Sequence, residues 1–394
     1  MSLIMSQKSK DEVLILTRAR YQRRGLGGRR KLLDEFCELC GYERKYAIKL
    51  LGGKRRAGGP VGQRGGAHAK YGEAERAVLK EIWLAAEQPC GKRLKAALRL
   101  WLPPYEAERG RLEDELRRRL GEISPATIDR LLAPCRTSLG SRGRCGTRPG
   151  TLLRTQIPVR TEHWDVAGPG WLEADTVAHC GESMAGDFCW SVTLTDVHTQ
   201  WTETRAVWNR GQHSVQARIQ EVEETLPFAI LGFDSDNGGE FLNWHLHDYF
   251  RLRVRPVDFS RSRPYRKNDN ARVEQKNWTH VRQLVGYGRL EHPEQAERLN
   301  ALYVKEWNLF RNFFCPVMKH LRTEVEGSRK RRVYDEPKTP FERLRESGGA
   351  DAQQILRLEK QRASLNPFEL KRRIEKKLRA VLQISPKRTR KTAA

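Results

Sequence analysis

Apolar residues near the N-terminus recur at the spacing of two short helices. The first set stands three or four residues apart and consists of Leu33, Phe36, Cys37 and Cys40. The second set follows a break at Gly41 and consists of Ala47, Leu50 and Leu51. Because this spacing places each set on one helix face, the pattern predicts two helices joined by a glycine turn, within a domain of residues 1–60. Such a unit is either a helix-turn-helix or an ordinary helical hairpin.

A second helical block is predicted for residues 67–136. Helical spacing of apolar residues recurs at 78–83 and at 94–101, just before Pro103 and Pro104. Another helix is predicted to begin at Ser124 and Pro125, since serine is a good N-cap and proline suits the first turn. Glycine-rich basic sequence predicts a linker at 52–66, and residues 137–168 predict a second basic linker after the block.

From residue 169 the pattern changes to that of strands. Segments rich in Val, Thr and Trp predict three successive strands at 171–177, 186–196 and 200–207. Helices predicted at 214–225, 241–250 and 271–285 then alternate with short apolar strands at 228–233 and 253–259. This order predicts an α/β core over residues 169–320, a mixed five-stranded sheet with helices on its faces. Residues 321–394 are predicted to form a basic, mainly helical C-terminal region.

The distribution of charge narrows the range of possible functions. The 394 residues carry a formal net charge of +25, yet residues 171–290 hold 14 basic and 16 acidic residues. The basic excess therefore lies in the flanks, where it would neutralise phosphates and attract nucleic acid. A ribosome-associated or merely soluble basic protein is the alternative. No run approaches the ~20 apolar residues of a membrane span, and the N-terminus lacks the apolar region of a signal peptide, so we expect a cytoplasmic protein with no membrane partner.

If the chain binds DNA, the second predicted N-terminal helix is the one that would enter the major groove. The residues expected to contact DNA there are Tyr42, Arg44, Lys45 and Lys49. The helical block at 67–136 is either a second DNA-reading unit or a spacer.

Zinc and ATP are not expected as cofactors. Cys37 and Cys40 have the spacing of zinc ligands, but no second Cys or His pair follows at finger spacing, and their position on an apolar face favours core packing. Neither Gly53-Lys54 nor Gly91-Lys92 has the earlier glycine of a Walker phosphate loop. The eight cysteines are irregularly spaced, which indicates reduced thiols rather than a disulfide framework.

Three carboxylates fall at positions where an active site is expected. Asp175 lies inside the first predicted strand of the core, Asp236 directly after the fourth, and Glu274 in the first turns of the last helix. Residues at strand ends converge on a crevice in open sheets, so these distant acids can meet. Clustered carboxylates repel one another unless cations lie between them, and oxygen-only ligands suit Mg²⁺ or Mn²⁺. Two such ions per site, about 3.5–4 Å apart, suit phosphodiester chemistry.

Neighbouring side chains leave alternatives open. Asp234 and Glu173 each stand two residues before a candidate on an extended segment, so each can face the same way as that candidate. Position favours Asp236 over Asp234, because Asp236 stands at the strand end beside a tight turn. His179 can meet the site, although a lone histidine after a strand is more often a surface or packing residue.

The motifs around these acids resemble those of a known family. Residues 173–177 read EADTV, residues 233–241 read FDSDNGGEF, and residues 263–277 read RPYRKNDNARVEQKN. They are similar to the D-T, DNG-x-EF and PY-x-x-N-x₅-E signatures of integrase-core transposases, which include bacterial insertion-sequence enzymes and retroviral integrases. The resemblance implies a ribonuclease H-like fold and maps the family's metal-binding catalytic acids to Asp175, Asp236 and Glu274. The zinc module in front of retroviral cores has no counterpart here.

The polar helix around Glu274 and the basic loop before it supply further expected DNA contacts. These residues are Arg266, Lys267, Asn270, Lys276, Asn277 and Trp278. Trp278 would either stack on an unpaired terminal base or pack in the core.

Together, the charge and the resemblance predict a DNA transposase. It would bind the terminal inverted repeats of a mobile element, free 3′ hydroxyls and join them to target DNA, so its partner is double-stranded DNA in the bacterial nucleoid. Because one active site serves each DNA end, at least a homodimer is expected on DNA. The alternatives are a non-catalytic DNA-binding regulator derived from a transposase and a structure-selective ribonuclease H-like nuclease.

Overall fold

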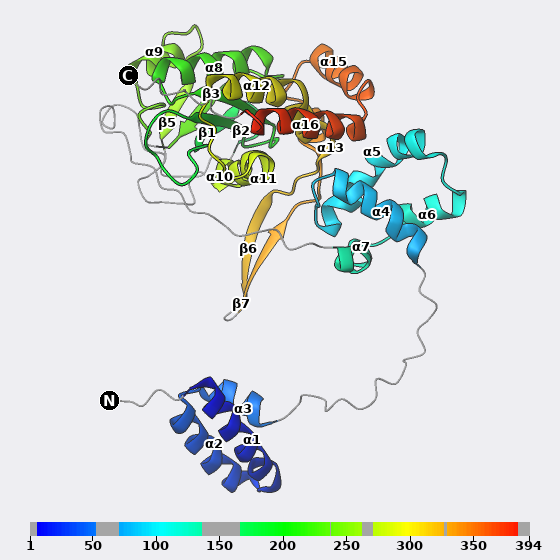
Figure 1. Ribbon diagram of the computed structural model, residues 1–394, viewed down its shortest axis with the longest axis vertical. Coiled ribbons are helices and arrows are strands. Elements are labelled where there is room, and N and C mark those ends of the chain that lie inside the picture. Colours follow the sequence, from blue (N-terminus) through cyan, green and yellow to red (C-terminus); the bar gives the residue numbers. More distant parts are fainter. Residues whose placement is uncertain are drawn as a thin grey trace, which may run out of the picture. The chain divides into compact units, whose positions relative to one another are not determined.

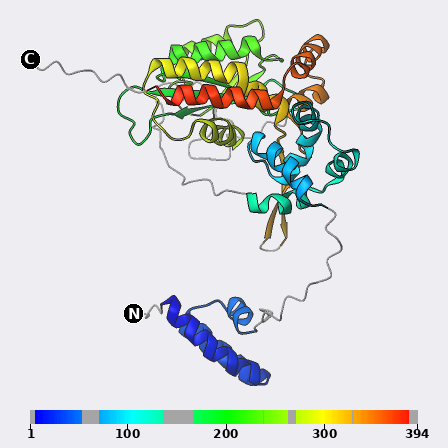
Figure 2. The same cartoon turned by 45° about the vertical axis from the view of Figure 1, so that its right-hand side comes forward.

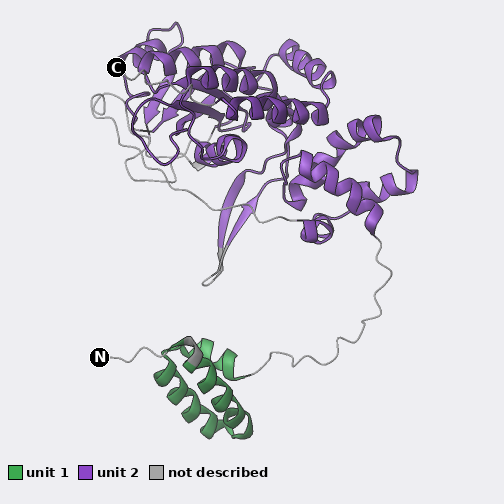
Figure 3. Ribbon diagram, viewed as in Figure 1, with its two compact units in different colours: residues 1–70 green, residues 71–394 purple. Residues whose placement is uncertain are grey.

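The structure is a computed structural model that describes residues 6–52, 71–135, 166–236, 238–261, 271–326 and 329–384. The chain divides into two compact units, residues 1–70 and residues 71–394 (Figure 3). No helix in the described ranges has both the length and the apolar character needed to cross a membrane.

The N-terminal unit contains three helices, α1 (Gln7–Arg23), α2 (Leu26–Cys40) and α3 (Arg44–Leu51). The two predicted helices are confirmed as α2 and α3. Gly41 ends α2 in the left-handed conformation, with φ of +66°, which glycine adopts without steric cost. The predicted apolar residues form the core of the unit, and Cys40 is buried in it, as the packing interpretation predicted. Helix α1 was not predicted, because its apolar residues form a continuous run at 13–16 rather than a helical spacing; its Arg18 donates to the Leu50 carbonyl at 2.6 Å.

The second unit begins with four helices, α4 (Glu73–Ala85), α5 (Gly91–Arg109), α6 (Asp114–Glu122) and α7 (Pro125–Leu132). Ser124 caps α7 as predicted, by accepting a hydrogen bond from the Thr127 amide at 3.2 Å. Helix α5 continues through Pro103 and Pro104 instead of stopping before them. Trp101 and Tyr105 are buried on the same helix face, so packing outweighs the loss of backbone hydrogen bonds at the prolines.

The predicted mixed five-stranded sheet is confirmed. Its strands are β1 (Trp171–Ala178), β2 (Cys189–Asp196), β3 (Thr202–Trp208), β4 (Gly232–Ser235) and β5 (Asp258–Arg261), in the order β3-β2-β1-β4-β5. Strands β1, β2 and β3 are antiparallel neighbours, whereas β4 and β5 run parallel to β1. The last two strands begin later than the predicted ranges 228–233 and 253–259. Strand β4 includes the carboxylate Asp234, whose pairing with Ser260 of β5 arises only in the folded sheet.

Five helical segments accompany the sheet. They are α8 (Gln212–Thr225), α9 (Trp244–Arg251) and a continuous helix made of α10 (Ala271–Lys276), the π-helical segment η2 (Asn277–Arg282) and α11 (Gln283–Val285). Figures 1 and 2 show α10 and α11 across the sheet from α8. The predicted helix at 271–285 is thus confirmed, with a π-helical turn that the sequence pattern did not predict.

The remaining elements pack onto this core. They are α12 (Pro293–Leu302), η3 (Tyr303–Trp307), α13 (Asn308–Phe314), the hairpin β6 (His320–Glu326) and β7 (Arg329–Tyr334), and the helices α14 (Pro340–Ser347), α15 (Ala352–Ala363) and α16 (Pro367–Leu382). The hairpin, which extends away from the sheet in Figure 1, was not predicted. Basic helix α16 lies beside α12 and buries Leu370, Ile374 and Val381, so its apolar face packs rather than facing solvent.

The helical block, the sheet and the C-terminal helices form one compact unit. Trp101 of α5 donates to the Phe314 carbonyl at 3.0 Å and meets the Phe368 ring edge to face at 5.0 Å. Arg99 of α5 pairs with Glu342 of α14 at 2.7 Å. The predicted ranges 67–136, 169–320 and 321–394 therefore do not correspond to separate compact units, because their apolar faces are buried against one another.

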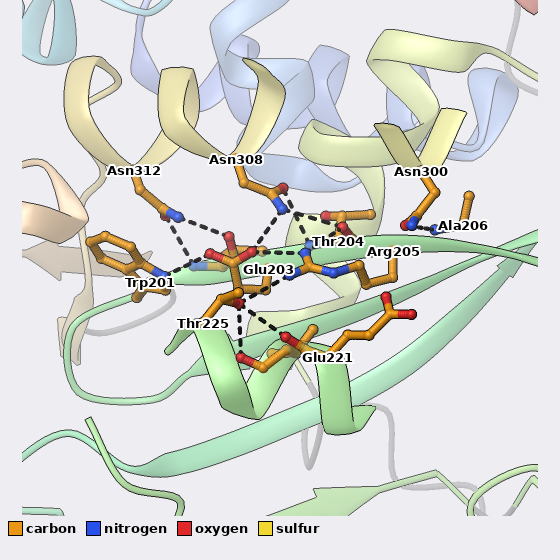
Figure 4. Close-up of polar contacts among 12 residues, drawn as sticks. Trp201, Glu203, Thr204, Arg205, Ala206, Glu221, Thr225, Asn300, Asn308 and Asn312 are labelled. Atoms are coloured by element: carbon orange, nitrogen blue, oxygen red, sulfur yellow. Dashed lines mark hydrogen bonds and ion pairs between the residues drawn. The ribbon is translucent and has the colours of Figure 1, made fainter. Parts of the chain in front are cut away.

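Strand β3 lies at one edge of the sheet, and asparagine side chains cover that edge (Figure 4). Asn308 and Asn312 each accept from a backbone amide of β3 and donate to the carbonyl of the same residue, Thr204 and Thr202 respectively. Asn300 accepts from the Ala206 amide at 3.0 Å. Alternate amides of an edge strand point outward, so these three side chains satisfy groups that would otherwise pair with another strand.

Candidate active site

Asp175 and Asp236 lie beside each other because β1 and β4 are parallel neighbours. Ala174 of β1 pairs with Ser235 of β4, and each of these residues is followed directly by one of the two aspartates. Burial raises the pKa of Asp175 well above its ordinary value, and the charge of Asp236 raises it further. Burial also raises the pKa of Asp236 to about 6, with the charge of Glu240 as the second cause. The sheet thus places two carboxylates where their ionised forms repel each other.

Glu274 faces the same pair from the first turn of α10. Its side chain is exposed, and its charge is one of the causes that raise the pKa of Asp175. The three acids predicted from the sequence therefore lie close enough to interact electrostatically. Across the described part of the chain, however, no three His, Cys, Asp or Glu side chains converge as closely as a metal centre requires.

Backbone and side-chain donors hold the two aspartates. The Thr176 amide donates to Asp175 Oδ1 at 2.7 Å, and the Gly238 amide donates to Asp236 Oδ1 at 2.9 Å. Asn277, which begins the π-helical segment, donates through Nδ2 to Asp175 Oδ2 at 2.7 Å. Asn277 was predicted to contact DNA, but its amide nitrogen lies on a candidate catalytic carboxylate. Single π-helical turns are frequent at functional sites, because they shift side chains relative to a regular helix.

The neighbouring acids Glu173 and Asp234 have partners elsewhere. Asp234 is buried and accepts from the Ser260 hydroxyl at 2.6 Å. Glu173 is also buried; it accepts from Arg272 at 2.9 Å and from the Val273 amide at 3.2 Å. Glu173 therefore anchors the first turn of α10 on the sheet, directly before Glu274. These contacts favour Asp236 over Asp234 and Asp175 over Glu173 as site residues.

Glu240 is a fourth carboxylate at the site. It lies in the motif at residues 233–241, and no role was predicted for it. It is only 3% exposed, and it accepts from the Thr176 hydroxyl at 2.9 Å and from Arg210 at 3.2 Å. A Cβ at position 238 would lie 2.5 Å from the Glu240 Oε2 atom, so Gly238 leaves the space that this carboxylate fills. The signal in the sequence was its place in the DNG-x-EF motif, four residues after Asp236.

The other predicted DNA contacts have mixed outcomes. Lys276 is 3% exposed with its Nζ 3.5 Å from the Gln200 carbonyl, and burial holds its pKa well below the ordinary value, so it does not lie on the open surface; its contact with DNA stays a prediction. Trp278 is 39% exposed, so the core-packing alternative is wrong. Three predicted contacts lie outside the described residues: Arg266, Lys267 and Asn270.

On the N-terminal unit, the predicted contacts differ in exposure. Arg44, Lys45 and Lys49 of α3 are exposed, and Arg44 pairs with Asp34 of α2. Tyr42 is half-buried, with its ring centroid 5.8 Å from that of Phe36. Contact of these four residues with DNA stays a prediction.

His179 does not face the carboxylates. It is fully buried and its Nε2 lies 2.8 Å from the Ser191 hydroxyl, which in turn bonds the Tyr303 hydroxyl. Burial lowers the pKa of His179 to about 3, so the imidazole is neutral. The packing alternative is correct for this residue.

Comparisons with known proteins give one relative over most of the chain. No family model matches. The chain is 37% identical over 344 residues to the uncharacterized protein y4rM of Sinorhizobium fredii (strain NBRC 101917 / NGR234), which covers 86% of this chain and 96% of that protein. A solved structure of the catalytic core domain of BIV integrase aligns with 46% of this chain and 96% of its own, at 14% identity and a TM-score of 0.31. A likeness this low carries no argument about function.

Proposed function

The chain belongs to the family of the Sinorhizobium fredii protein y4rM, and we propose that it is a DNA transposase with a ribonuclease H-like catalytic core. It binds the terminal inverted repeats of a mobile element, cleaves to free 3′ hydroxyls and joins these ends to target DNA. The observation that carries the proposal is the position of Asp236 and Glu274 near enough to Asp175 for both charges to act on it: Asp175 lies in β1, Asp236 directly follows the parallel neighbour β4, and Glu274 lies in α10. The three sequence motifs that resemble integrase-core transposases contain these same residues.

The donor set suits a pair of Mg²⁺ or Mn²⁺ ions. It consists of carboxylate oxygens alone, and their mutual repulsion is the condition that a hard divalent cation relieves. Asp175, Asp236 and Glu274 would hold the ions. When bound, the ions would activate an attacking oxygen and stabilise the leaving one.

The chain's own groups support these acids in separate ways. Asn277 fixes the orientation of the Asp175 carboxylate, and the Gly238 amide does the same for Asp236. Glu173 holds the first turn of α10, which sets the position of Glu274. A water molecule attacks the phosphorus at the element's end and displaces the element's 3′ oxygen, which leaves as a hydroxyl while the phosphate stays on the flanking DNA. This hydroxyl then attacks a target phosphorus in line and displaces the target's 3′ oxygen. No covalent enzyme intermediate is needed, in contrast to serine and tyrosine recombinases.

The basic flanks supply the DNA binding that this chemistry requires. The exposed basic residues of α3 follow a glycine turn and are placed as on a recognition helix. Joining two ends calls for two active sites, so the active species on DNA is at least a dimer. A non-catalytic regulator would have no need of three acids gathered at one site, and a nuclease of the same fold would cut without joining.

Cleavage and joining assays with labelled repeat ends and a target plasmid test the proposal. The repeats are identified as inverted sequences that bound the gene. Asp175→Asn is expected to abolish both reactions while repeat binding persists, and Asp187→Asn, at an exposed loop position, is the matched control. Chelation is expected to stop wild-type joining, and added Mg²⁺ or Mn²⁺ to restore it. Joining by Asp175→Asn in the presence of either ion would refute the assignment.

A further inference from the structure

A pocket of about 360 Å³ lies along the helix that carries Glu274. This volume is within the range of roughly 300–1,000 Å³ that is usual for small-molecule sites. The residues that matter below come from α5, the turn before β3, α10, η2, α13 and β7: Arg93, Gln200, Lys276, Trp278, Arg311 and Tyr334. We call it the cation pocket.

Three cations line the cation pocket with few partners. Lys276 and Arg311 are each 3% exposed, and Arg93 is half-buried. Arg93 donates through Nε to the Pro316 carbonyl at 2.6 Å, and among the described residues Lys276 Nζ has one acceptor, the Gln200 carbonyl at 3.5 Å. Within the described residues, Arg311 Nε is buried without a hydrogen-bond partner, and the guanidinium stacks over Trp307 at 5.4 Å.

No carboxylate among the lining residues is free to neutralise these cations. Glu87 is the one acidic residue in the described lining, and its carboxylate pairs with Lys371 of α16. Arg343 is buried nearby, but Asp335 neutralises it at 2.6 Å. Buried cations without counter-charges are costly, because burial removes their hydration. An anion from outside the chain would supply the missing charge and the missing hydrogen-bond acceptors.

Two exposed aromatic rings line the same pocket. Trp278 is 39% exposed and Tyr334 is 42% exposed. A base stacks on such a ring with little sequence preference, whereas its phosphate requires cations. An aromatic face beside buried cations therefore suits a nucleotide better than it suits an inorganic anion.

One helix forms a wall of both the cation pocket and the candidate active site. Asn277 points to Asp175, while the residues on either side of it, Lys276 and Trp278, line the pocket. Trp278 follows Glu274 by four residues, about one helical turn. A DNA strand whose scissile phosphodiester lies at Asp175 therefore has its neighbouring nucleotides within reach of the pocket.

We propose that the cation pocket binds one unpaired nucleotide next to the cleaved end of the element, with its phosphate on Arg93, Lys276 and Arg311 and its base against Trp278. The choice of DNA as the source of the nucleotide rests on the proposed function. The nucleotide chemistry itself follows from the lining of the pocket. Binding there would hold the DNA end open beside the three acids.

Anisotropy measurements in the Asp175→Asn background test this without any strand cleavage. The full chain is titrated with two repeat-end duplexes, one fully paired and one with three unpaired nucleotides at the cleaved strand's end. The unpaired end is expected to bind about tenfold more tightly, since stacking of one base contributes about 1–3 kcal/mol. Because both duplexes meet the same basic flanks, their affinity ratio isolates the pocket.

Variants assign the preference to the pocket. Trp278→Ala and Arg93→Gln, both at partly exposed positions, are each expected to bring the ratio close to one. The matched controls Trp244→Ala and Lys305→Gln change an exposed tryptophan of α9 and an exposed lysine of η3, and are expected to leave it unchanged. An unchanged ratio in both pocket variants, or equal binding of the two duplexes by the parent protein, would overturn the proposal.

The free nucleotide is a second probe. Calorimetric titration with deoxyadenosine 5′-monophosphate is expected to show binding that Arg93→Gln weakens about tenfold, the loss of one charge-assisted hydrogen bond. Nucleotide binding without any preference for unpaired ends would refute DNA as the source. If the nucleotide proposal is wrong, Asp175→Asn still abolishes joining. If the transposase proposal is wrong, Asp175→Asn still joins DNA ends. The two outcomes are therefore distinguishable.

Discussion

The asparagines that cover β3 make a graded prediction about stability. Asn308 makes three hydrogen bonds: it accepts from the Thr204 amide at 3.3 Å and donates to the Thr204 carbonyl at 3.2 Å and to Glu203 Oε2 at 2.8 Å. Asn312 makes two, both at 3.0 Å to the backbone of Thr202. Asn300 makes one, to the backbone of β3 at Ala206.

Alanine at each position should destabilise the second unit in that order. A hydrogen bond contributes about 1 kcal/mol net, and a buried group left without a partner costs about 1–3 kcal/mol. Asn308→Ala also leaves Glu203 with fewer donors in a buried pair with Arg205. We therefore expect losses of about 4 kcal/mol for Asn308→Ala, about 2–3 for Asn312→Ala and about 1 for Asn300→Ala.

Urea unfolding of the full chain, followed by the tryptophan fluorescence of the second unit, measures these differences. Asn308→Asp keeps the side-chain volume and changes the hydrogen bonding. It keeps the acceptor for the Thr204 amide, but it loses both N–H donors and adds a negative charge beside Glu203. It should therefore be at least as destabilising as Asn308→Ala. A loss for Asn308→Ala no greater than that for Asn300→Ala would refute the edge-covering role.

The active site and core make three further predictions. The folded state keeps His179 neutral until about pH 3, whereas the unfolded chain takes up a proton there near pH 6.5. The free energy of unfolding should therefore decrease as pH falls below 6.5, by about 2 kcal/mol at pH 5. The difference between wild-type and His179→Gln unfolding curves measures this loss. The affinity for Mg²⁺ should fall as pH drops through about 6, where Asp236 takes up a proton in the metal-free site, and Glu240→Gln should shift this loss to lower pH by removing a negative charge; calorimetric Mg²⁺ titrations that show no shift would contradict the influence of Glu240 on Asp236. Asn277→Ala should slow joining about tenfold at unchanged DNA affinity, because it removes a hydrogen bond to the Asp175 carboxylate. Equal losses of joining rate and DNA affinity would indicate a DNA contact instead.

Much of the sheet could be predicted because its strands have strong local patterns. Residues 171–207 are rich in β-branched and aromatic side chains, and their three strands were located closely. The fourth strand was placed too early, because the apolar run ends at Phe233 while the pairing continues through Asp234. A carboxylate can lie in a buried strand only with a partner, and Ser260, 26 residues further on, is not visible as that partner in the sequence.

The helix after β5 shows where local pattern misled the prediction of side-chain roles. Val273, Lys276 and His280 follow helical spacing and are all buried, so Lys276 occupies a core-facing position despite its charge. Glu274 and Trp278 lie on the exposed face. The description of this helix as polar did not take account of this phase, which the sequence alone already contained.

The burial of Lys276 follows from packing that no local pattern contains. The wall around it is built from α5, the turn before β3 and α13, which lie far apart in the sequence. These elements meet only because the helical block at 71–135 packs on the sheet unit, as the contact of Trp101 with Phe314 shows. The helical block therefore has a structural role besides the two predicted alternatives, a DNA reader and a spacer. It supplies Arg93 to a cation-lined cavity, and the helix that carries Glu274 forms another wall of that cavity.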